Sequence, residues 1–129
     1  MTWLVPLLLV LHVVPAVFWA GSTAVLARPG TIALPLPLRA PQTGSAAGAI
    51  IFGMILWGML HRGDAGTPEY VLGAGALCAL TAFALQQLVA WPALRRDPEG
   101  GAARFASAQR ISSILLIVAL SAMVTFRYA

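Results

Sequence analysis

The chain has 129 residues, of which 60% are hydrophobic and only 9% are charged, and its mean hydropathy is +0.86. A soluble domain carries roughly 25% charged residues, so this composition excludes an ordinary water-soluble fold and predicts an integral membrane protein. The net charge of +4 comes from arginines that flank the apolar segments without interleaved aromatic residues, so we expect no nucleic-acid partner.

Four apolar segments, each close to the roughly 20 residues needed to cross a hydrocarbon core, predict four transmembrane helices. Hydrophobic length and turn residues place these helices at about 3–27, 45–62, 69–91 and 106–127. They account for most of the chain, so we expect a single all-α domain over 1–129, a four-helix bundle in the membrane. The bilayer is its expected partner, together with other membrane protein subunits or further copies of the chain.

The first predicted helix contains His12, the only titratable side chain that lies well inside a predicted span. An ionisable residue at this depth is costly and is a candidate for function. Trp19 follows two turns later on the same helix face. His12 could ligate haem iron or copper through one ring nitrogen while the other is held by a hydrogen bond. The alternative is a neutral histidine bonded to a carbonyl, such as one freed by Pro15.

Residues 11–21 read LHVVPAVFWAG, a His-x6-Trp-x-Gly pattern. The pattern resembles the first-helix signature of the copper resistance protein D-like membrane family and of the related HemJ-type protoporphyrinogen oxidases, and its conserved types fall on His12, Trp19 and Gly21. The resemblance implies a small haem- or copper-associated membrane protein in which His12 is a ligand or lies near the cofactor. HemJ-type enzymes also carry a functional lysine. This chain contains no lysine, so we expect no protoporphyrinogen oxidase and claim no enzyme activity.

The first connection, residues 28–44, is rich in proline, which favours an extended and irregular path. The second predicted helix carries a stripe of Ala49, Gly53 and Trp57 that ends at His61. His61 is a second candidate ligand for haem or a metal, or else an interfacial histidine. Its predicted depth differs from that of His12 by roughly 7 Å, which is awkward for one haem held between both.

The third predicted helix has one face of small residues, on which Gly75, Ala79 and Ala82 are followed by Gln86 and Ala90. Close packing of small residues holds helices together in lipid. We therefore expect another helix to occupy this groove, with Gln86 hydrogen-bonded across the interface.

Three methionines add a copper alternative, because thioether sulfur suits cuprous copper, although methionine is also a common filler in apolar bundles. They are Met54, Met59 and Met123.

The arginines predict the orientation, because cytoplasmic connections carry the excess of positive charge. Six belong to the first and third connections and their margins: Arg28, Arg39, Arg95, Arg96, Arg104 and Arg110. The other side holds Arg62 and Arg127, which could bind haem propionates or anchor helix ends. We expect a multi-pass protein of the bacterial inner membrane with both termini in the periplasm.

The sequence thus favours a protein that binds haem b, or alternatively copper, on the periplasmic side and serves electron transfer or metal handling. The expected cofactor-binding residues are His12, His61, Trp19, Arg62 and Arg127, with the two histidines as metal ligands. The alternative is a non-catalytic accessory subunit of a larger membrane complex, in which His12 is a satisfied core residue. A transporter is a third and weaker possibility, because every carboxylate falls in a connection.

Overall fold

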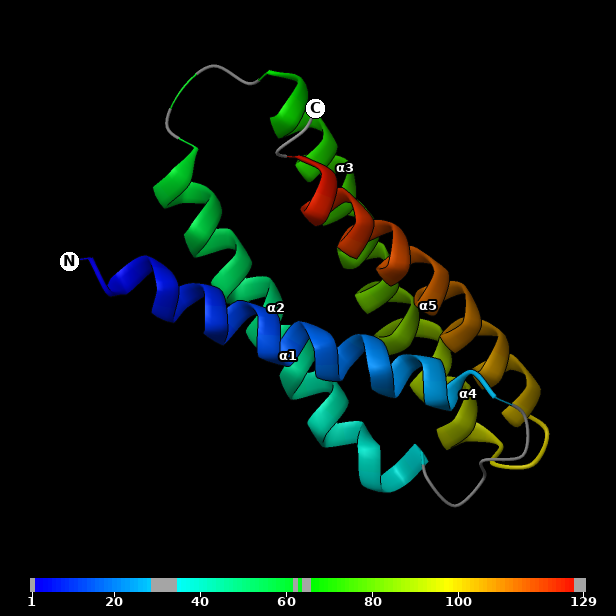
Figure 1. The fold of residues 1–129 in the computed structure, drawn as a ribbon. Helices are drawn as coiled ribbons and strands as arrows, with labels where there is room; N and C mark the ends of the chain where they lie inside the picture. The colour runs from blue at the N-terminus through cyan, green and yellow to red at the C-terminus, as the bar shows by residue number, and fades with distance from the viewer. Residues whose placement is uncertain (1, 29–34, 62, 64–65, 127–129) are drawn as a thin grey trace.

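Helices make up nearly all of the computed structural model, which describes residues 2–28, 35–61, 63 and 66–126 (Figure 1). Helix α1 spans Leu4–Leu26 and α2 spans Pro35–Leu60. The described residues contain no β-strand. The all-α architecture predicted from the sequence is confirmed.

The third span is one continuous rod in three parts. Helix α3 covers Thr67–Leu85, a π-helical turn η1 covers Gln86–Ala90, and α4 covers Trp91–Arg96. Helix α5 covers Ala102–Thr125. With α1 and α2, these elements give four helices that are long and apolar enough to cross a membrane.

The second helix begins at Pro35, well before the predicted start near residue 45. Pro35 and Pro37 lie in the first turn, where a backbone N–H has no partner within the helix and its absence costs nothing. Pro41 lies inside the helix. Part of the segment predicted to be irregular is therefore helical, because prolines at a helix start are compatible with the helix.

Proline also explains the π-helical turn in the third span. Pro92 has no N–H to donate, so the regular hydrogen-bond pattern cannot continue through it. Immediately before it, the N–H of Trp91 bonds to the carbonyl of Gln86, five residues back. The extra residue in this turn lets the rod continue to Arg96, instead of ending near residue 91 as predicted.

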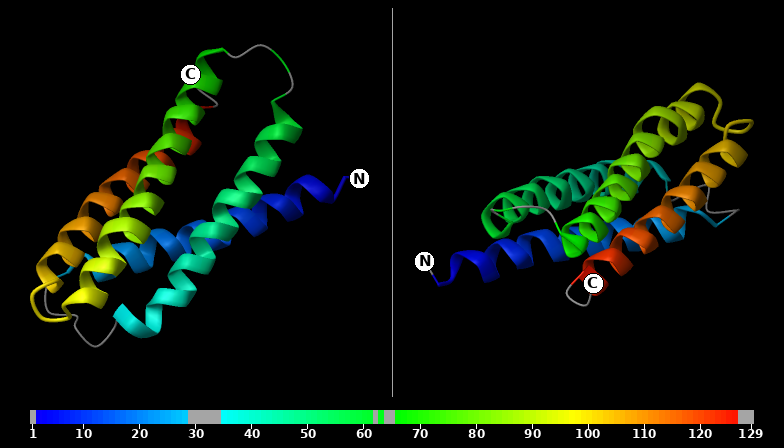
Figure 2. Two further views of the ribbon diagram at one scale, coloured as in Figure 1. Left: turned by 180° about the vertical axis from the view of Figure 1, so that it is seen from behind. Right: turned by 90° about the horizontal axis from the view of Figure 1, so that it is seen from above.

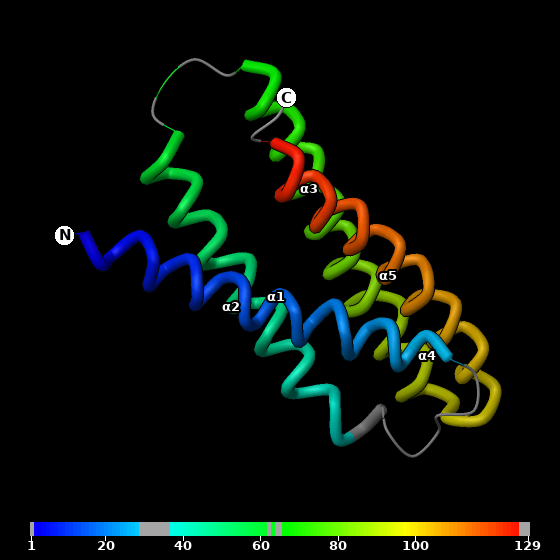
Figure 3. Tube along the Cα trace, viewed as in Figure 1, coloured from blue at the N-terminus to red at the C-terminus, as the bar shows by residue number. Residues whose placement is uncertain are grey.

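Two helix pairs build the molecule: α1 packs across α2, and α3 packs along α5. The pairs meet mainly through α1 and α5, whereas α2 and α3 make little contact although a short link joins them (Figure 2). The trace in Figure 3 shows α1 crossing α2 near the middle of both helices. At this crossing the ring of Pro15 lies against Gly48.

The face of small residues on the third span is buried as predicted. Gly75, Ala79, Ala82, Gln86 and Ala90 are all buried. Ala79 and Ala82 belong to an apolar cluster around Trp19 near the centre of the bundle, and Ala90 belongs to a second cluster around Trp91 at the end where α5 begins.

Candidate functional site: two histidines and a glutamine cluster

His12 lies half-buried in α1 and is tied to α2. Its ring nitrogen Nδ1 lies 2.7 Å from the carbonyl oxygen of Ala49. A carbonyl only accepts, so Nδ1 carries the proton, and in the neutral ring Nε2 keeps a lone pair. The sequence offered a carbonyl freed by Pro15 as one partner for this histidine; the carbonyl that it contacts belongs to the neighbouring helix.

Gly53 makes the approach of His12 possible. A Cβ atom at this position would lie 2.9 Å from Cε1 of His12 and 3.2 Å from Nδ1, closer than side chains pack. The stripe of Ala49 and Gly53 predicted on α2 is therefore the surface on which His12 rests.

His61 lies directly after α2, in different surroundings. Its ring packs against Trp57 with centroids 5.1 Å apart and the ring planes tilted by 31°, and it meets Phe126 edge-on at 6.1 Å. Its Nδ1 is buried and bonds to no group in the described part of the chain. At 1.5 Å per residue, His61 lies about 12 Å further along the helix than Gly53. His12 contacts Ala49 and Gly53 whereas His61 contacts Trp57 and Phe126, so the structure does not bring the two histidines together.

Trp19 is buried in the centre of the bundle, with 2% of its surface exposed. Its indole Nε1 donates a hydrogen bond of 2.8 Å to Oε1 of Gln86, and its ring meets Phe83 edge-on at 6.3 Å. Its polar atom is thus used within the protein and lies away from His12. The other two predicted cofactor contacts, Arg62 and Arg127, lie outside the described residues.

A cluster of three glutamines forms the polar centre of the molecule. Gln42 of α2, Gln86 of η1 and Gln109 of α5 are each 0% exposed, as is Thr23 of α1. Nε2 of Gln86 donates to Oγ1 of Thr23 at 2.9 Å and to Oε1 of Gln109 at 3.2 Å. All four spans contribute a side chain, so this cluster, with Trp19 bonded to it, connects the whole bundle.

Gln42 completes the glutamine cluster from the second span. Its Nε2 donates to Oγ1 of Thr23 at 3.2 Å and reaches Oε1 of Gln109 at 3.4 Å, and the Thr23 hydroxyl donates to the carbonyl of Trp19 at 2.7 Å. Two polar atoms, Oε1 of Gln42 and Nε2 of Gln109, have no partner among the groups described. The cluster therefore has one hydrogen-bond acceptor and one hydrogen-bond donor that bond to no described group.

Uncharged amides and a hydroxyl limit what the glutamine cluster can do. These groups neither exchange protons near neutral pH nor bind metals strongly, so they offer no acid–base chemistry. They can hold other polar groups by hydrogen bonds in surroundings where unpaired polar atoms are costly. The arrangement supports fixed positions of the four spans.

Sequence reasoning found one of the three glutamines. Gln86 was predicted to bond across a helix interface, and this is confirmed. Gln42 was missed because it fell in the segment assigned to the first connection. Gln109 was missed because it lies among the arginines at the start of the last helix. Both residues could have been found by looking for amide side chains close to an apolar span, where a polar side chain is costly unless it is hydrogen-bonded.

The second apolar cluster closes this end of the bundle. Trp91 packs on Phe105 with ring centroids 5.0 Å apart, and the guanidinium of Arg39 lies 5.9 Å from the centre of the Trp91 ring, within range of a cation–π interaction. The glutamine cluster therefore lies between two layers of aromatic and aliphatic side chains.

Metal ligands do not gather within the described residues: no three His, Cys, Asp or Glu side chains form a group there. A metal held by His12 would draw its other ligands from elsewhere. The chain matches no protein-family model, no curated protein and no solved structure. The resemblance to the copper resistance protein D-like and HemJ-type families therefore rests on residues 11–21 alone.

Proposed function

We propose that this chain is a small multi-pass membrane protein that binds haem b through Nε2 of His12 and serves electron transfer. The hydrogen bond of 2.7 Å from Nδ1 of His12 to the Ala49 carbonyl carries the proposal. Histidines that ligate a metal almost always donate their other ring N–H to a carbonyl, carboxylate or water, which fixes the tautomer and the ring orientation. His12 has this arrangement inside a span, where a histidine is otherwise costly.

His12 would offer the haem iron one ligand nitrogen, Nε2, while Nδ1 stays bonded to the Ala49 carbonyl. His61 lies about 12 Å further along α2 than Gly53 and packs against Trp57, so the proposal assigns the iron His12 and no second histidine. When bound, haem supplies one-electron redox chemistry. The chain contributes the ligand nitrogen, its orientation and apolar surroundings. Copper is the alternative occupant of the same nitrogen, since imidazole suits both metals.

The expected setting is the bacterial inner membrane with both termini in the periplasm, as the arginine distribution predicts. His12 then lies on the periplasmic side of the glutamine cluster. An electron partner would dock at the outer surface, and that surface carries few of the arginines.

The absorbance spectrum of the purified protein tests this proposal. Wild type, His12→Ala and His61→Ala would be expressed with added haem precursor, purified in mild detergent, and measured oxidised and dithionite-reduced. We expect a b-type difference spectrum in wild type and in His61→Ala, and its loss in His12→Ala with restoration by added imidazole. A wild-type protein that is colourless after incubation with hemin and free of copper by elemental analysis would overturn the proposal.

A second candidate function is that of a non-catalytic accessory subunit. Both aromatic side chains of the His-x6-Trp motif bond to other helices of the same bundle, His12 to α2 and Trp19 to η1. This use gives the motif a structural role without any cofactor. Stoichiometric recovery of a colourless protein with larger membrane subunits, after cross-linking in native membranes, would favour this function.

A further inference from the structure

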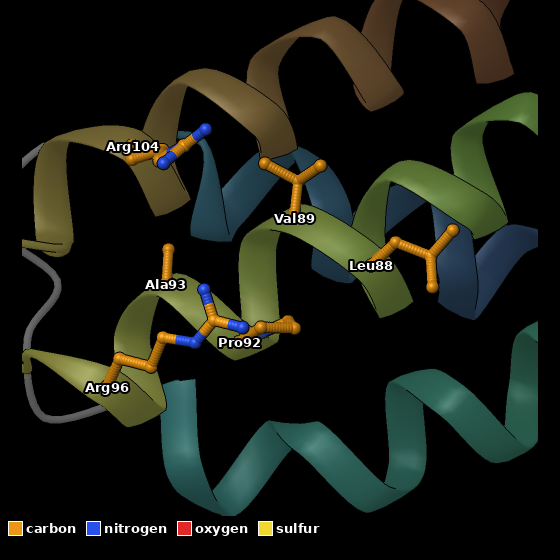
Figure 4. A pocket seen from close by; sticks show the side chains of 6 residues that line it. All are labelled: Leu88, Val89, Pro92, Ala93, Arg96 and Arg104. Atoms are coloured by element: carbon orange, nitrogen blue, oxygen red, sulfur yellow. The ribbon is translucent and has the colours of Figure 1, made fainter.

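A pocket of about 80 Å³ opens where the third span meets the start of α5 (Figure 4). η1, α4 and α5 all contribute to it, and its lining residues are Leu88, Val89, Pro92, Ala93, Arg96 and Arg104. The volume is of the order of two or three water molecules' share of the liquid, enough for a phosphate group. It is independent of the site at His12.

Two arginines give the pocket a positive charge. Arg96 and Arg104 come from different helices and flank Ala93 (Figure 4), and both side chains are exposed. In the described part of the chain no carboxylate forms an ion pair with either guanidinium. The adjacent carboxylate of Asp97 accepts a hydrogen bond from the N–H of Gly100 at 3.0 Å. Two guanidinium groups that line one pocket favour an anion that can accept bidentate hydrogen bonds.

The rest of the lining is hydrocarbon and identifies the kind of anion. Leu88 is 76% exposed and lines the pocket with Val89 and Pro92, on the side away from the two arginines (Figure 4). A free phosphate ion gains nothing from such a surface. A phospholipid combines a phosphate with acyl chains, so its two parts match the two parts of the lining.

The position along the helix matches the headgroup region of a bilayer. The span Thr67–Arg96 has 30 residues, about 45 Å at 1.5 Å per residue, whereas the hydrocarbon core is about 30 Å thick. The terminal turns must therefore reach into the headgroup layer if the helix crosses the membrane. Arg96 ends this span and Arg104 lies in the first turn of α5.

We infer that this pocket binds the phosphate of an anionic phospholipid between Arg96 and Arg104, with an acyl chain along Leu88, Val89 and Pro92. Basic pockets between transmembrane helices on the cytoplasmic side commonly hold anionic headgroups, and this is the side to which the arginine distribution assigns the pocket. The bound lipid neutralises the two guanidinium groups and fixes the junction of α4 and α5.

Native mass spectrometry of the full chain tests this inference. The protein would be exchanged into detergent containing phosphatidylglycerol or phosphatidylcholine with identical acyl chains. We expect one retained phosphatidylglycerol and much less phosphatidylcholine. In Arg96→Gln/Arg104→Gln the retained fraction falls by about tenfold. Arg95→Gln/Arg110→Gln loses the same charge outside the pocket and is expected to retain the lipid.

Equal loss in both double variants would overturn the inference, because binding would then follow total charge. Equal retention of the two lipids by wild type would also overturn it, and this comparison needs no variant to fold. Displacement of the lipid by millimolar inorganic phosphate would show a site for free anions instead.

Discussion

Gln86 uses both ends of its amide inside the bundle. Its oxygen accepts from the indole of Trp19, and its nitrogen donates to Thr23 and Gln109. Each partner belongs to another part of the chain and none can reach water. In lipid such bonds contribute modestly, about 0.6 kcal/mol each on average, but three of them share this side chain. Loss of Gln86 also leaves the buried Trp19 N–H without an acceptor.

Gln86→Met is expected to lower the free energy of unfolding by about 2 kcal/mol, because the shape of the side chain is kept while three hydrogen bonds are lost. The measurement is thermal or denaturant unfolding of the purified protein in detergent. Gln87→Met is the matched control, since Gln87 makes one half-buried bond, to Thr43 at 3.2 Å. A loss in the control as large as in Gln86→Met would contradict a central role for the cluster.

Residue periodicity predicted which side chains share a face but not what each one meets. His12 and Trp19 share a face of α1 and were assigned to one cofactor site. Because α1 crosses α2 at a steep angle (Figure 3), this face lies on α2 at His12 and on η1 at Trp19. The angle at which two helices cross depends on the packing of all four spans. It cannot be predicted from the sequence of one helix.

At the scale of elements, α3 and α5 pack closely at Gly75. A Cβ atom there would lie 2.7 Å from Cβ of Ala122 and 3.2 Å from the carbonyl oxygen of Ala119. Backbones can approach this closely only where side chains are minimal, and close approach supplies dispersion contacts where lipid offers no hydrophobic driving force.

Gly75→Ala is expected to destabilise the protein by about 1–3 kcal/mol, because the added methyl group pushes α3 away from α5. Gly73→Ala makes the same change in the same helix, where the new Cβ would meet only Trp57 at an ordinary 3.8 Å. We expect it to be neutral or stabilising by up to about 1 kcal/mol through helix propensity. Unfolding of the two variants side by side decides the point, and equal stability would refute the close contact.

The number of spans could be predicted from apolar length, whereas two helix boundaries could not. Prolines were treated as breakers near residues 35–41 and at Pro92. In the structure Pro35 and Pro37 start a helix, Pro41 lies inside it, and Pro92 follows a π-helical turn within a continuous rod. Proline removes one donor, and whether that ends a helix depends on whether the donor was needed at that position.

At the scale of the molecule, arginines gather at the end that also holds the glutamine cluster. Arg39, Arg95, Arg96, Arg104 and Arg110 lie within the first turns or final turns of their helices at this end. The rule that cytoplasmic connections are positive assigns this end to the cytoplasm.

Cysteine labelling is expected to confirm this orientation. Cys78 is the only cysteine and can be replaced by serine, after which single cysteines are introduced at Gly63 and at Glu99. A membrane-impermeant maleimide should label the cysteine at 63 in intact cells, because the arginine distribution predicts that this connection faces the periplasm. It should label the cysteine at 99 only after lysis. The reversed pattern would place both termini in the cytoplasm.

The polar bonds between the helix pairs lie toward one end of the molecule, which has a consequence for its mechanics. Gln42 lies about 27 Å from the far end of α2, and Gln109 about 24 Å from the far end of α5. A change of roughly 10° in the angle between the pairs, pivoting at the amides, would shift these distant ends by about 4 Å. α2 and α3 have little contact to oppose this movement. Lateral pressure from the bilayer would therefore change the angle between the two helix pairs around the glutamine cluster. The Trp57–His61–Phe126 contacts at the far end would change first.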